Sequence, residues 1–504
     1  MEFGKQGCPR PRPTALSEEL RGMSPTTYVV SAGACHTVAL VTPSATGRDP
    51  HTSIPADEAG SDLRGISPQS SSSSTLYTWG GGEEGQLGHG DSDDRLHPTE
   101  VASLTEVPLS SVACGANHTI AVSSLRDEVY AWGWGDFGRL GIGDPSDVLV
   151  PTPIPALSGV AVAQVACGDS HCMVVATDGR LFTFGRNQNG QLGLGDTEDR
   201  LHPHVVQSLW DDGVKVRRAA GGAEHSAITV EGGEMYTFGW GRYGNLGHGH
   251  TNDVHVPTKV AGLAGQNVRE PVCGWRHSAA LTDEGRLWTF GWSKYGQLGL
   301  GDNVDHWEPV LLPEFQGGPI TAASGGWRHM CALAGSTGTL YAWGWNQFGQ
   351  LGIGNTKDAN SPQRVIVGGD GGDDANGSNA SGGARVTAVA CGWRHTVAVA
   401  ESLSDSAAPG EVFTWGRGVN GQLGLGDALQ RNIPARVDAL DLIRQGISVG
   451  VLVGGDVGGG SDLIGGGAGG GGKRPAETHL HELEVPSVTK KLHVDEREVP
   501  DAVP

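Results

Sequence analysis

Two observations on the sequence predict an all-β fold, a seven-bladed β-propeller with disordered termini. A Gly-x-Leu-Gly string recurs seven times, with starts 52 to 54 residues apart and a longer last gap of 72. Each copy also holds four short apolar runs bounded by Gly and Pro, the pattern of four strands joined by tight turns. Seven such units arranged in a ring make a seven-bladed propeller. The strings start at Gly85, Gly138, Gly190, Gly244, Gly296, Gly349 and Gly421.

Within each unit the predicted elements follow a fixed order. A Gly-x-x-His turn leads into a strand of small and branched residues. The next apolar run closes on an aromatic-Gly pair such as Trp132-Gly133, and a Pro-led run such as that at Pro151 follows. In this interpretation the first unit, from about Tyr28, lacks its Pro-led strand, and the last unit has a spare one at 434–437. We therefore expect a C-terminal strand to complete the blade that the N-terminal segment begins.

Composition marks the segments outside the repeats. Low-complexity stretches rich in Pro, Ser, Gly and Asp are typical of disordered tails, linkers and flexible loops. The predicted segments are a disordered N-terminal stretch at 1–27, a propeller at 28–440 with flexible insertions at 43–74 and 367–384, a Gly-rich linker at 441–472 and a charged tail at 473–504.

Charge and hydropathy exclude several classes of function. A formal net charge of −21 argues against nucleic acid as the main partner, because phosphate binding needs a basic surface. No apolar run approaches the roughly 18 residues that span a bilayer, and no leader-like segment is visible, so we expect an intracellular protein without a membrane anchor. No motif for a nucleophile, a catalytic carboxylate pair or a phosphate-binding loop stands out, so we expect no enzyme.

The cysteines and histidines of the repeats are interpreted as structural. Cysteine recurs directly before the Gly-x-x-His turn, where a small buried residue is a simpler interpretation than a metal or redox site. A histidine that occurs in all seven turns is expected to hold the blades together rather than to bind metal or to catalyse. These histidines are His36, His118, His171, His225, His277, His329 and His395.

Only three of the seven turns carry a Trp-Arg pair. The pairs are Trp275-Arg276, Trp327-Arg328 and Trp393-Arg394, in consecutive units. Since equivalent turns of neighbouring blades lie side by side, these residues should gather on one face of the ring. What all units share is expected to be scaffold, so this face is the candidate for function.

The same face is predicted to carry a split charge. Acidic residues follow the aromatic-Gly pair in the first two units, basic ones in the fourth and fifth, and Asp169 and Glu224 lie opposite the Trp-Arg turns. Such a surface is complementary to itself under a two-fold rotation, as an isologous homodimer requires. An ordinary scatter of surface charge is the alternative. Indoles beside arginines favour the interface, with cation–π contacts of roughly 0.5–2 kcal/mol each and a marked sensitivity to salt.

The repeats differ from the WD and kelch types and resemble those of the regulator of chromosome condensation family over residues 28–440. Together with the three Gly-Trp-Arg-His turns, they make the chain similar to the plant and algal UV-B photoreceptors of the UV-resistance-locus type. The strings that carry this resemblance are GWGDFGRLG from Gly133, GRNQNGQLGLGD from Gly185, GWGRYGNLG from Gly239 and GWSKYGQL from Gly291.

The resemblance implies a chromophore made of the protein's own tryptophans, with no bound cofactor. Trp327 and Trp275 would be the main sensing pair, in a cross-dimer cluster completed by Trp393 and Trp134. Arginines would hold the dimer together against acidic partners. The implied interface residues are Arg276, Arg328, Arg394, Arg186, Arg242, Asp136, Asp147, Glu224 and Glu84.

The resemblance also implies partners and a site of action. UV-B would separate the homodimer into monomers, which would bind the WD-repeat domain of an E3 ubiquitin ligase. WD-repeat factors could drive re-dimerisation, and the protein would act in cytoplasm and nucleus on photomorphogenic and UV-acclimation gene expression. Two Val-Pro pairs in the tail, Val485-Pro486 and Val499-Pro500, suit peptide capture by such a partner, and an unstructured tail without a partner is the alternative.

Two other functions remain open on the sequence. The first is guanine-nucleotide exchange on a Ran-type GTPase, the founding activity of the repeat family. The acidic charge and the three Trp-Arg turns argue against it. The second is a generic propeller scaffold, whose Trp-Arg face would lack self-complementarity.

Overall fold

The structure is a computed structural model that describes residues 27–42, 74–125, 127–313, 315–368, 384–402 and 410–440. These residues belong to the first of two compact units, Met1–Val449, and the second unit, Gly450–Pro504, lies wholly outside them. The predicted N-terminal stretch, both insertions, the linker and the tail with Val485-Pro486 and Val499-Pro500 fall outside the described residues, except at their edges. Those segment predictions therefore stay predictions.

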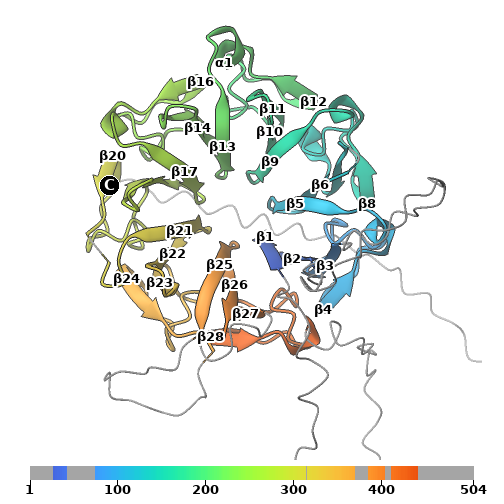
Figure 1. Cartoon of the computed structure of the whole chain (residues 1–504), viewed down its shortest axis with the longest axis vertical. Coiled ribbons are helices and arrows are strands. Elements are labelled where there is room, and N and C mark those ends of the chain that lie inside the picture. The colour runs from blue at the N-terminus through green and yellow to red at the C-terminus, as the bar shows by residue number, and fades with distance from the viewer. Residues whose placement is uncertain are drawn as a thin grey trace, which may run out of the picture. The chain divides into compact units, whose positions relative to one another are not determined.

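Twenty-eight strands of the described residues form seven four-stranded antiparallel sheets, which confirms the propeller (Figure 1). Blade 1 holds β1 Thr27–Ala32, β2 His36–Thr42, β3 Thr75–Gly80 and β4 Arg95–Glu100; blade 2 holds β5 Leu109–Cys114, β6 His118–Ser123, β7 Val129–Gly133 and β8 Val148–Pro153. Blade 3 holds β9 Val162–Cys167, β10 His171–Ala176, β11 Leu181–Gly185 and β12 Arg200–Val205; blade 4 holds β13 Val216–Gly221, β14 His225–Val230, β15 Met235–Gly239 and β16 Val254–Lys259.

Blade 5 holds β17 Val268–Cys273, β18 His277–Thr282, β19 Leu287–Gly291 and β20 His306–Leu311; blade 6 holds β21 Ile320–Gly325, β22 His329–Ala334, β23 Thr339–Gly344 and β24 Ala359–Val365. Blade 7 holds β25 Arg385–Cys391, β26 His395–Glu401, β27 Glu411–Gly416 and β28 Arg431–Arg436. Short helices are η1 Ala102–Leu104, η2 Asp136–Gly138, η3 Pro155–Leu157, α1 Gln207–Asp211 and η4 Ala261–Leu263. In the part of the chain that the structure describes, no helix is long and apolar enough to cross a membrane.

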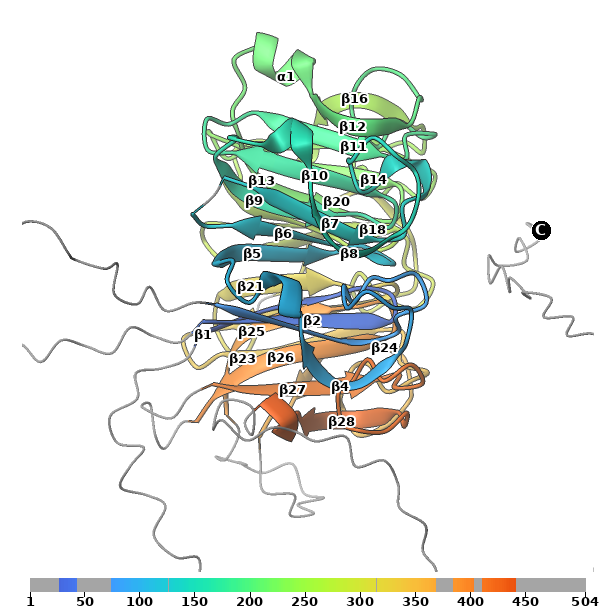
Figure 2. The ribbon, with the colours of Figure 1, turned by 90° about the vertical axis from the view of Figure 1, so that its right-hand side faces the viewer.

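The first strand of every blade lies at the centre of the ring and the fourth at its rim (Figure 1). Seen from the edge, the strands run across the thickness of the ring, so their ends define its two faces (Figure 2). The prolines that were expected to lead the last run of each unit lie within the fourth strands, for example Pro98 in β4. A rim strand has one unpaired edge, which is where a residue without an N–H is tolerated.

The predicted closure of the ring by a shared blade is wrong. Every sheet is built from consecutive strands: β4 completes blade 1, and β28 pairs with β27 in blade 7. The error arose from where the boundary between units was placed. In the structure the Pro-containing strand comes after the Gly-x-Leu-Gly string and belongs to the same blade as that string, so no unit lacks this strand and none has a spare one. The ring closes through side chains and turns instead. Thr37 Oγ1 lies 2.9 Å from His395 Nε2, and Trp79 Nε1 donates to the Gln422 carbonyl at 3.0 Å.

The blades pack through the aromatic residue of each aromatic-Gly pair, and all seven of these residues have no solvent exposure. Four are tryptophans, and each indole N–H donates to a main-chain carbonyl of the preceding blade, as Trp132 Nε1 does to Gln86 at 2.9 Å. A glycine is required beside each ring: a Cβ on Gly88, whose φ is +81°, would lie 2.8 Å from Trp132 Nε1. Truncating such a buried aromatic residue typically costs about 3–5 kcal/mol.

Six of the seven buried histidines bond to a neighbouring blade, in line with the structural role that their recurrence predicts. They place Nε2 2.8–3.1 Å from a hydroxyl or thiol of the next blade, for example His225 with Ser278 at 2.9 Å. The exception is His277. Its ring nitrogens have no hydrogen-bond partner among the described residues, because blade 6 carries Met330 where the other blades carry Ser, Thr or Cys.

Candidate functional site: the tryptophan and arginine face

The Trp-Arg turns and the loops after the aromatic-Gly pairs lie on the same face of the ring. The turns join first to second strands, and the loops join third to fourth strands, so both occur at one end of each sheet. Within a blade the two segments are bonded through their backbones: Trp292 N donates to the Arg276 carbonyl at 3.0 Å, and Trp345 N to that of Arg328 at 2.8 Å. The loop tryptophans are thereby held against the turn arginines.

Neighbouring turns are also linked backbone to backbone around the centre of the ring. Trp275 N donates to the Gly326 carbonyl at 3.2 Å, and Trp393 N donates to that of Gly33 at 3.1 Å. A Cβ on Gly274 would lie 2.1 Å from the His277 ring, so this position requires glycine. The turns surround a central cavity of about 110 Å³. The side chains of the turns are therefore positioned by a rigid scaffold.

The three turn tryptophans form one continuous aromatic row across blades 5, 6 and 7. The ring centroids of Trp275 and Trp327 are 5.2 Å apart, and those of Trp327 and Trp393 are 5.7 Å apart and nearly parallel. Trp327 is only 7% exposed, at the middle of the row. Such spacing is typical of aromatic pairs that interact directly.

A second aromatic row, from the loops, packs behind the first. Trp292 lies 5.7 Å from Trp275, and Trp345 lies 5.6 Å from Trp327, both in edge-to-face geometry. Both loop tryptophans are buried. The row continues through tyrosine and phenylalanine side chains; its members are Trp240, Tyr243, Trp292, Tyr295, Trp345 and Phe348. The pattern of three Trp-Arg turns did not reveal this row, although the residues after each aromatic-Gly pair carry it.

Each turn arginine stacks on an indole. Arg276 Cζ lies 3.6 Å from the centroid of Trp275, Arg328 Cζ lies 3.9 Å from that of Trp327, and Arg394 Cζ lies 4.7 Å from that of Trp327. Arg328 is only 5% exposed. A cation over an indole face contributes about 0.5–2 kcal/mol, more where water is excluded. The arginines and tryptophans of this face therefore form one interdependent cluster.

Two of these arginines also reach the preceding blade. Arg276 Nη1 donates to the Tyr243 hydroxyl at 3.3 Å, and Arg328 Nη1 donates to the Tyr295 hydroxyl at 3.0 Å. In blade 6 the position of these tyrosines is occupied by Phe348, which has no hydroxyl. Arg394 Cζ therefore lies over the Phe348 ring, 5.7 Å from its centroid. These tyrosines were not among the predicted site residues.

Trp134 lies apart from the row, in blade 2, with a cation of its own. Arg139 Cζ lies 3.9 Å from the Trp134 centroid, and Arg139 Nε donates to the Asp136 carbonyl at 2.9 Å. Arg139 has no solvent exposure, and burial lowers the pKa of its guanidinium to about 10. The sequence could have identified Arg139 as a site residue, because the other six units carry Gln or Asn at this position.

The arc opposite the Trp-Arg turns carries acidic groups that are partly used within the chain. Arg186 Nη1 and Glu224 Oε1 form an ion pair of 2.9 Å between blades 3 and 4. Trp393 Nε1 donates to Asp169 Oδ1 at 3.3 Å. Burial raises the pKa of Asp169 to about 7, partly offset by the indole hydrogen bond. One acid of this arc is therefore largely protonated below neutral pH.

The remaining predicted interface residues lie on the loops of this face. Asp136, Asp147 and Arg242 are exposed, and Glu84 is half-buried. Asp147 has a further contact, because its Oδ1 accepts from Gly135 N at 2.9 Å. The equivalent aspartate makes the same bond in five other blades, so Asp147 also supports its own loop. The structure thus brings Trp275, Trp327 and Trp393 together with the turn arginines, and places Trp134 on another arc.

The family description "Regulator of chromosome condensation (RCC1) repeat" matches residues 73–122, 126–175, 178–229, 232–281, 284–333, 337–399 and 409–451. Human WBSCR16 is a structural neighbour with a TM-score of 0.61 and 27% identity, covering 72% of this chain and 93% of that one. Yeast RCC1 (Prp20), in a complex with Kap60, has a TM-score of 0.60 at 21% identity, covering 72% and 83%, which shows the fold alone.

The fold and the repeats together define an RCC1-repeat β-propeller that carries a cluster of tryptophans and arginines on one face. The Ultraviolet-B receptor UVR8 of Arabidopsis thaliana is 45% identical to this chain over 414 residues, 82% of each protein. The chain belongs to the UVR8 family of RCC1-repeat propellers. A more distant relative is the human E3 ubiquitin-protein ligase HERC2, 32% identical over 375 residues, which are 73% of this chain and 7% of that protein.

Proposed function

We propose that this protein is a UV-B photoreceptor whose chromophore is its own tryptophan cluster. The observation that carries the proposal is the row Trp275–Trp327–Trp393, with centroid spacings of 5.2 and 5.7 Å and an arginine stacked on its first two members. The 45% identity to a named UV-B receptor supports it. Trp327 and Trp275 are the main sensing pair, and no bound cofactor is needed.

The sensing step follows from the physics of indoles in contact. Indole absorbs UV-B, and rings at these spacings exchange excitation or charge. A guanidinium less than 4 Å from a ring centroid is held there by the electrons of that ring, so a change in those electrons weakens the contact. Excitation of Trp275 or Trp327 therefore disturbs Arg276 and Arg328, which are also bonded to the preceding blade.

The dark state is an isologous homodimer through this face. A two-fold rotation brings the arginines of blades 5–7 in one copy opposite the acidic residues of blades 1–4 in the other. Trp134 of the second copy completes the indole cluster. The arginines of blades 5–7 are Arg276, Arg328 and Arg394, and Arg186 of blade 3 and Arg242 of blade 4 add to them. The acids are Asp136, Asp147, Glu224 and Glu84. Because the interface depends on many charge pairs, salt weakens it and loss of one cluster breaks it.

Monomerisation exposes the face and permits signalling. The monomer and its tail bind the WD-repeat domain of an E3 ubiquitin ligase, through Val485-Pro486 or Val499-Pro500. WD-repeat factors return the protein to the dimer. The protein acts in cytoplasm and nucleus and alters photomorphogenic and UV-acclimation gene expression.

Size-exclusion chromatography at low salt tests the proposal. Wild-type protein in the dark should elute as a dimer and, after narrow-band UV-B, as a monomer. Trp327→Phe should stay dimeric under light, whereas Trp307→Phe, on the exposed rim strand β20, should respond like wild type. An unchanged elution volume in wild type would reject the photoreceptor and favour the exchange-factor or scaffold functions.

A further inference from the structure

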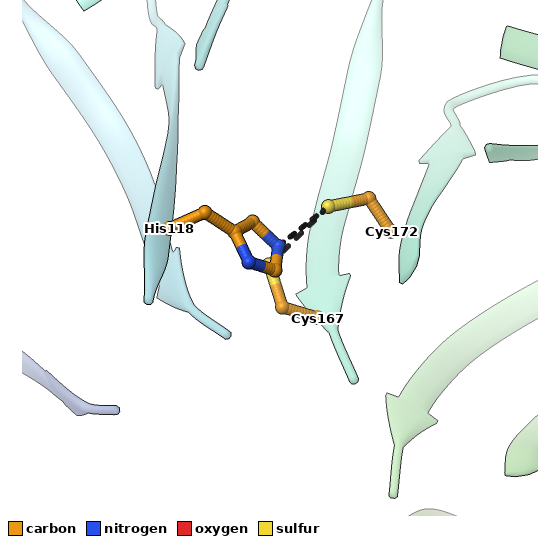
Figure 3. A group of neighbouring side chains, drawn as sticks. All are labelled: His118, Cys167 and Cys172. Atoms are coloured by element: carbon orange, nitrogen blue, oxygen red, sulfur yellow. Dashed lines mark hydrogen bonds between the residues drawn. The ribbon is translucent and has the colours of Figure 1, made fainter. Parts of the chain in front are cut away.

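Between blades 2 and 3 the structure brings together one histidine and two cysteines that the proposed light response does not use. His118 begins β6, Cys167 ends β9 and Cys172 lies at the start of β10 (Figure 3). His118 Nε2 lies 3.1 Å from Cys172 Sγ, and the two sulfur atoms are 3.7 Å apart. The three donor atoms all lie within 4.8 Å of one another.

The spacing of the sulfur atoms fits a shared metal ion. Two thiolates bound at about 2.3 Å to one ion in trigonal or tetrahedral geometry lie roughly 3.8–4 Å apart. Two cysteines and one imidazole are a soft donor set, which selects thiophilic cations such as copper(I). A structural zinc site normally has four protein ligands. The described residues supply three, which favours copper(I), an ion that accepts three-fold coordination.

The surroundings supply access and charge. Cys167 lines the central cavity, so an ion can reach this ligand from the opening of the ring, while His118 and Cys172 are fully buried. The Cys172 thiol also donates to the Arg139 carbonyl at 3.3 Å, and the buried Arg139 charge interacts with Cys172. A copper(I) ion with two thiolates carries a net charge of −1, which this guanidinium offsets.

We propose that His118, Cys167 and Cys172 form a copper(I) site that ties blade 2 to blade 3. On binding, both thiols lose their protons to solvent and form bonds from sulfur to copper, and His118 binds through the lone pair of Nε2 without a change in its protonation. A second cluster with the same ligand types, His329, Cys331 and Cys391, joins blades 6 and 7, and Cys391 also lines the cavity. We assign the same ion to it.

The test is an anaerobic titration of reduced, metal-free, full-length protein with copper(I) in competition with a chromogenic copper(I) chelator. Wild type should hold two equivalents. Cys172→Ser should hold one equivalent. This variant should fold, because Ser226 and Ser278 occupy the equivalent position in blades 4 and 5 and bond the turn histidine of the blade before, at 2.8 and 2.9 Å. Cys172→Ser combined with Cys331→Ala should hold none; Ala227 and Ala279 are the natural precedents for that alanine.

A matched control is Cys273→Ala. Cys273 lies at the same repeat position as Cys167, but belongs to neither cluster, so this variant should keep both equivalents. X-ray absorption should find two sulfur neighbours and one nitrogen around each copper. Fewer than one equivalent in wild type, equal stoichiometry in Cys172→Ser, or tighter binding of zinc(II) than of copper(I) would each overturn the assignment. Copper(I) should also raise the Tm of wild type and leave that of the double variant unchanged.

Discussion

The indole of Trp393 and the carboxyl group of Asp169 bridge the central opening of the ring. Trp393 Nε1 donates to Asp169 Oδ1 at 3.3 Å, and this bond joins blade 7 to blade 3, which are not neighbours. Every other contact of the Trp-Arg turns described above lies within a blade or between adjacent blades. The bond therefore links one end of the tryptophan row to the acidic arc of the same face.

Asp169 predicts a pH dependence of stability. Its folded-state pKa of about 7 exceeds the ordinary value of 3.8, chiefly because of burial. Between these values the folded protein holds a proton that the unfolded chain has released, so the free energy of unfolding falls as the pH rises. Asp169→Asn keeps the acceptor oxygen and removes the titration. Urea unfolding between pH 4 and 7 should show the variant gaining stability relative to wild type as the pH rises; a constant difference would contradict this origin.

The hydroxyl of Tyr295 predicts a separation of stability from assembly. Tyr295→Phe removes the 3.0 Å bond from Arg328 and recreates the natural arrangement at Phe348, so we expect a loss of about 1 kcal/mol and an intact dimer. Arg328→Ala also removes the stacking on Trp327 and should weaken the dimer strongly. Denaturant titration and sedimentation at fixed ionic strength measure the two effects. Equal weakening of the dimer by both variants would refute the distinction.

His277 should be the least important of the seven buried histidines for stability. Its imidazole makes no hydrogen bond among the described residues, whereas that of His225 bonds Ser278 at 2.9 Å. His277→Leu should therefore cost at least about 1 kcal/mol less than His225→Leu, since only the latter loses an inter-blade bond. Thermal and urea unfolding of the two variants, side by side, gives the comparison. The idea fails if His277→Leu is the more destabilising of the pair.

The repeat pattern was sufficient to predict the fold and the location of the candidate face, because strand periodicity and turn glycines are local properties. Contacts between units were harder to predict. Arg139 was overlooked because the sequence does not show that its side chain is buried against Trp134. The hydrogen bond between Asp147 and Gly135 likewise became visible only in the structure. Ring closure was predicted wrongly because the sequence does not state to which sheet a Pro-containing run belongs. The repeat cysteines and histidines were interpreted as structural, because the clusters of His118 and His329 each combine residues of two adjacent blades, which only the structure brings together.

The indole hydrogen bonds between blades are distributed unevenly around the ring. This distribution predicts which blades open most readily to amide hydrogen exchange. Blades 3, 4 and 5 carry Phe184, Phe238 and Phe290 in place of the buried tryptophan, so no indole N–H bonds them to the blade before. The junction of blades 7 and 1 has both an indole bond and a histidine bond. The junctions of blades 6 with 7 and 1 with 2 carry the same two kinds of bond. Amide hydrogen exchange should accordingly be fastest along the arc of blades 3 to 5 and slower from blade 6 round to blade 2, so the chain closes on itself within the firmer half of the ring.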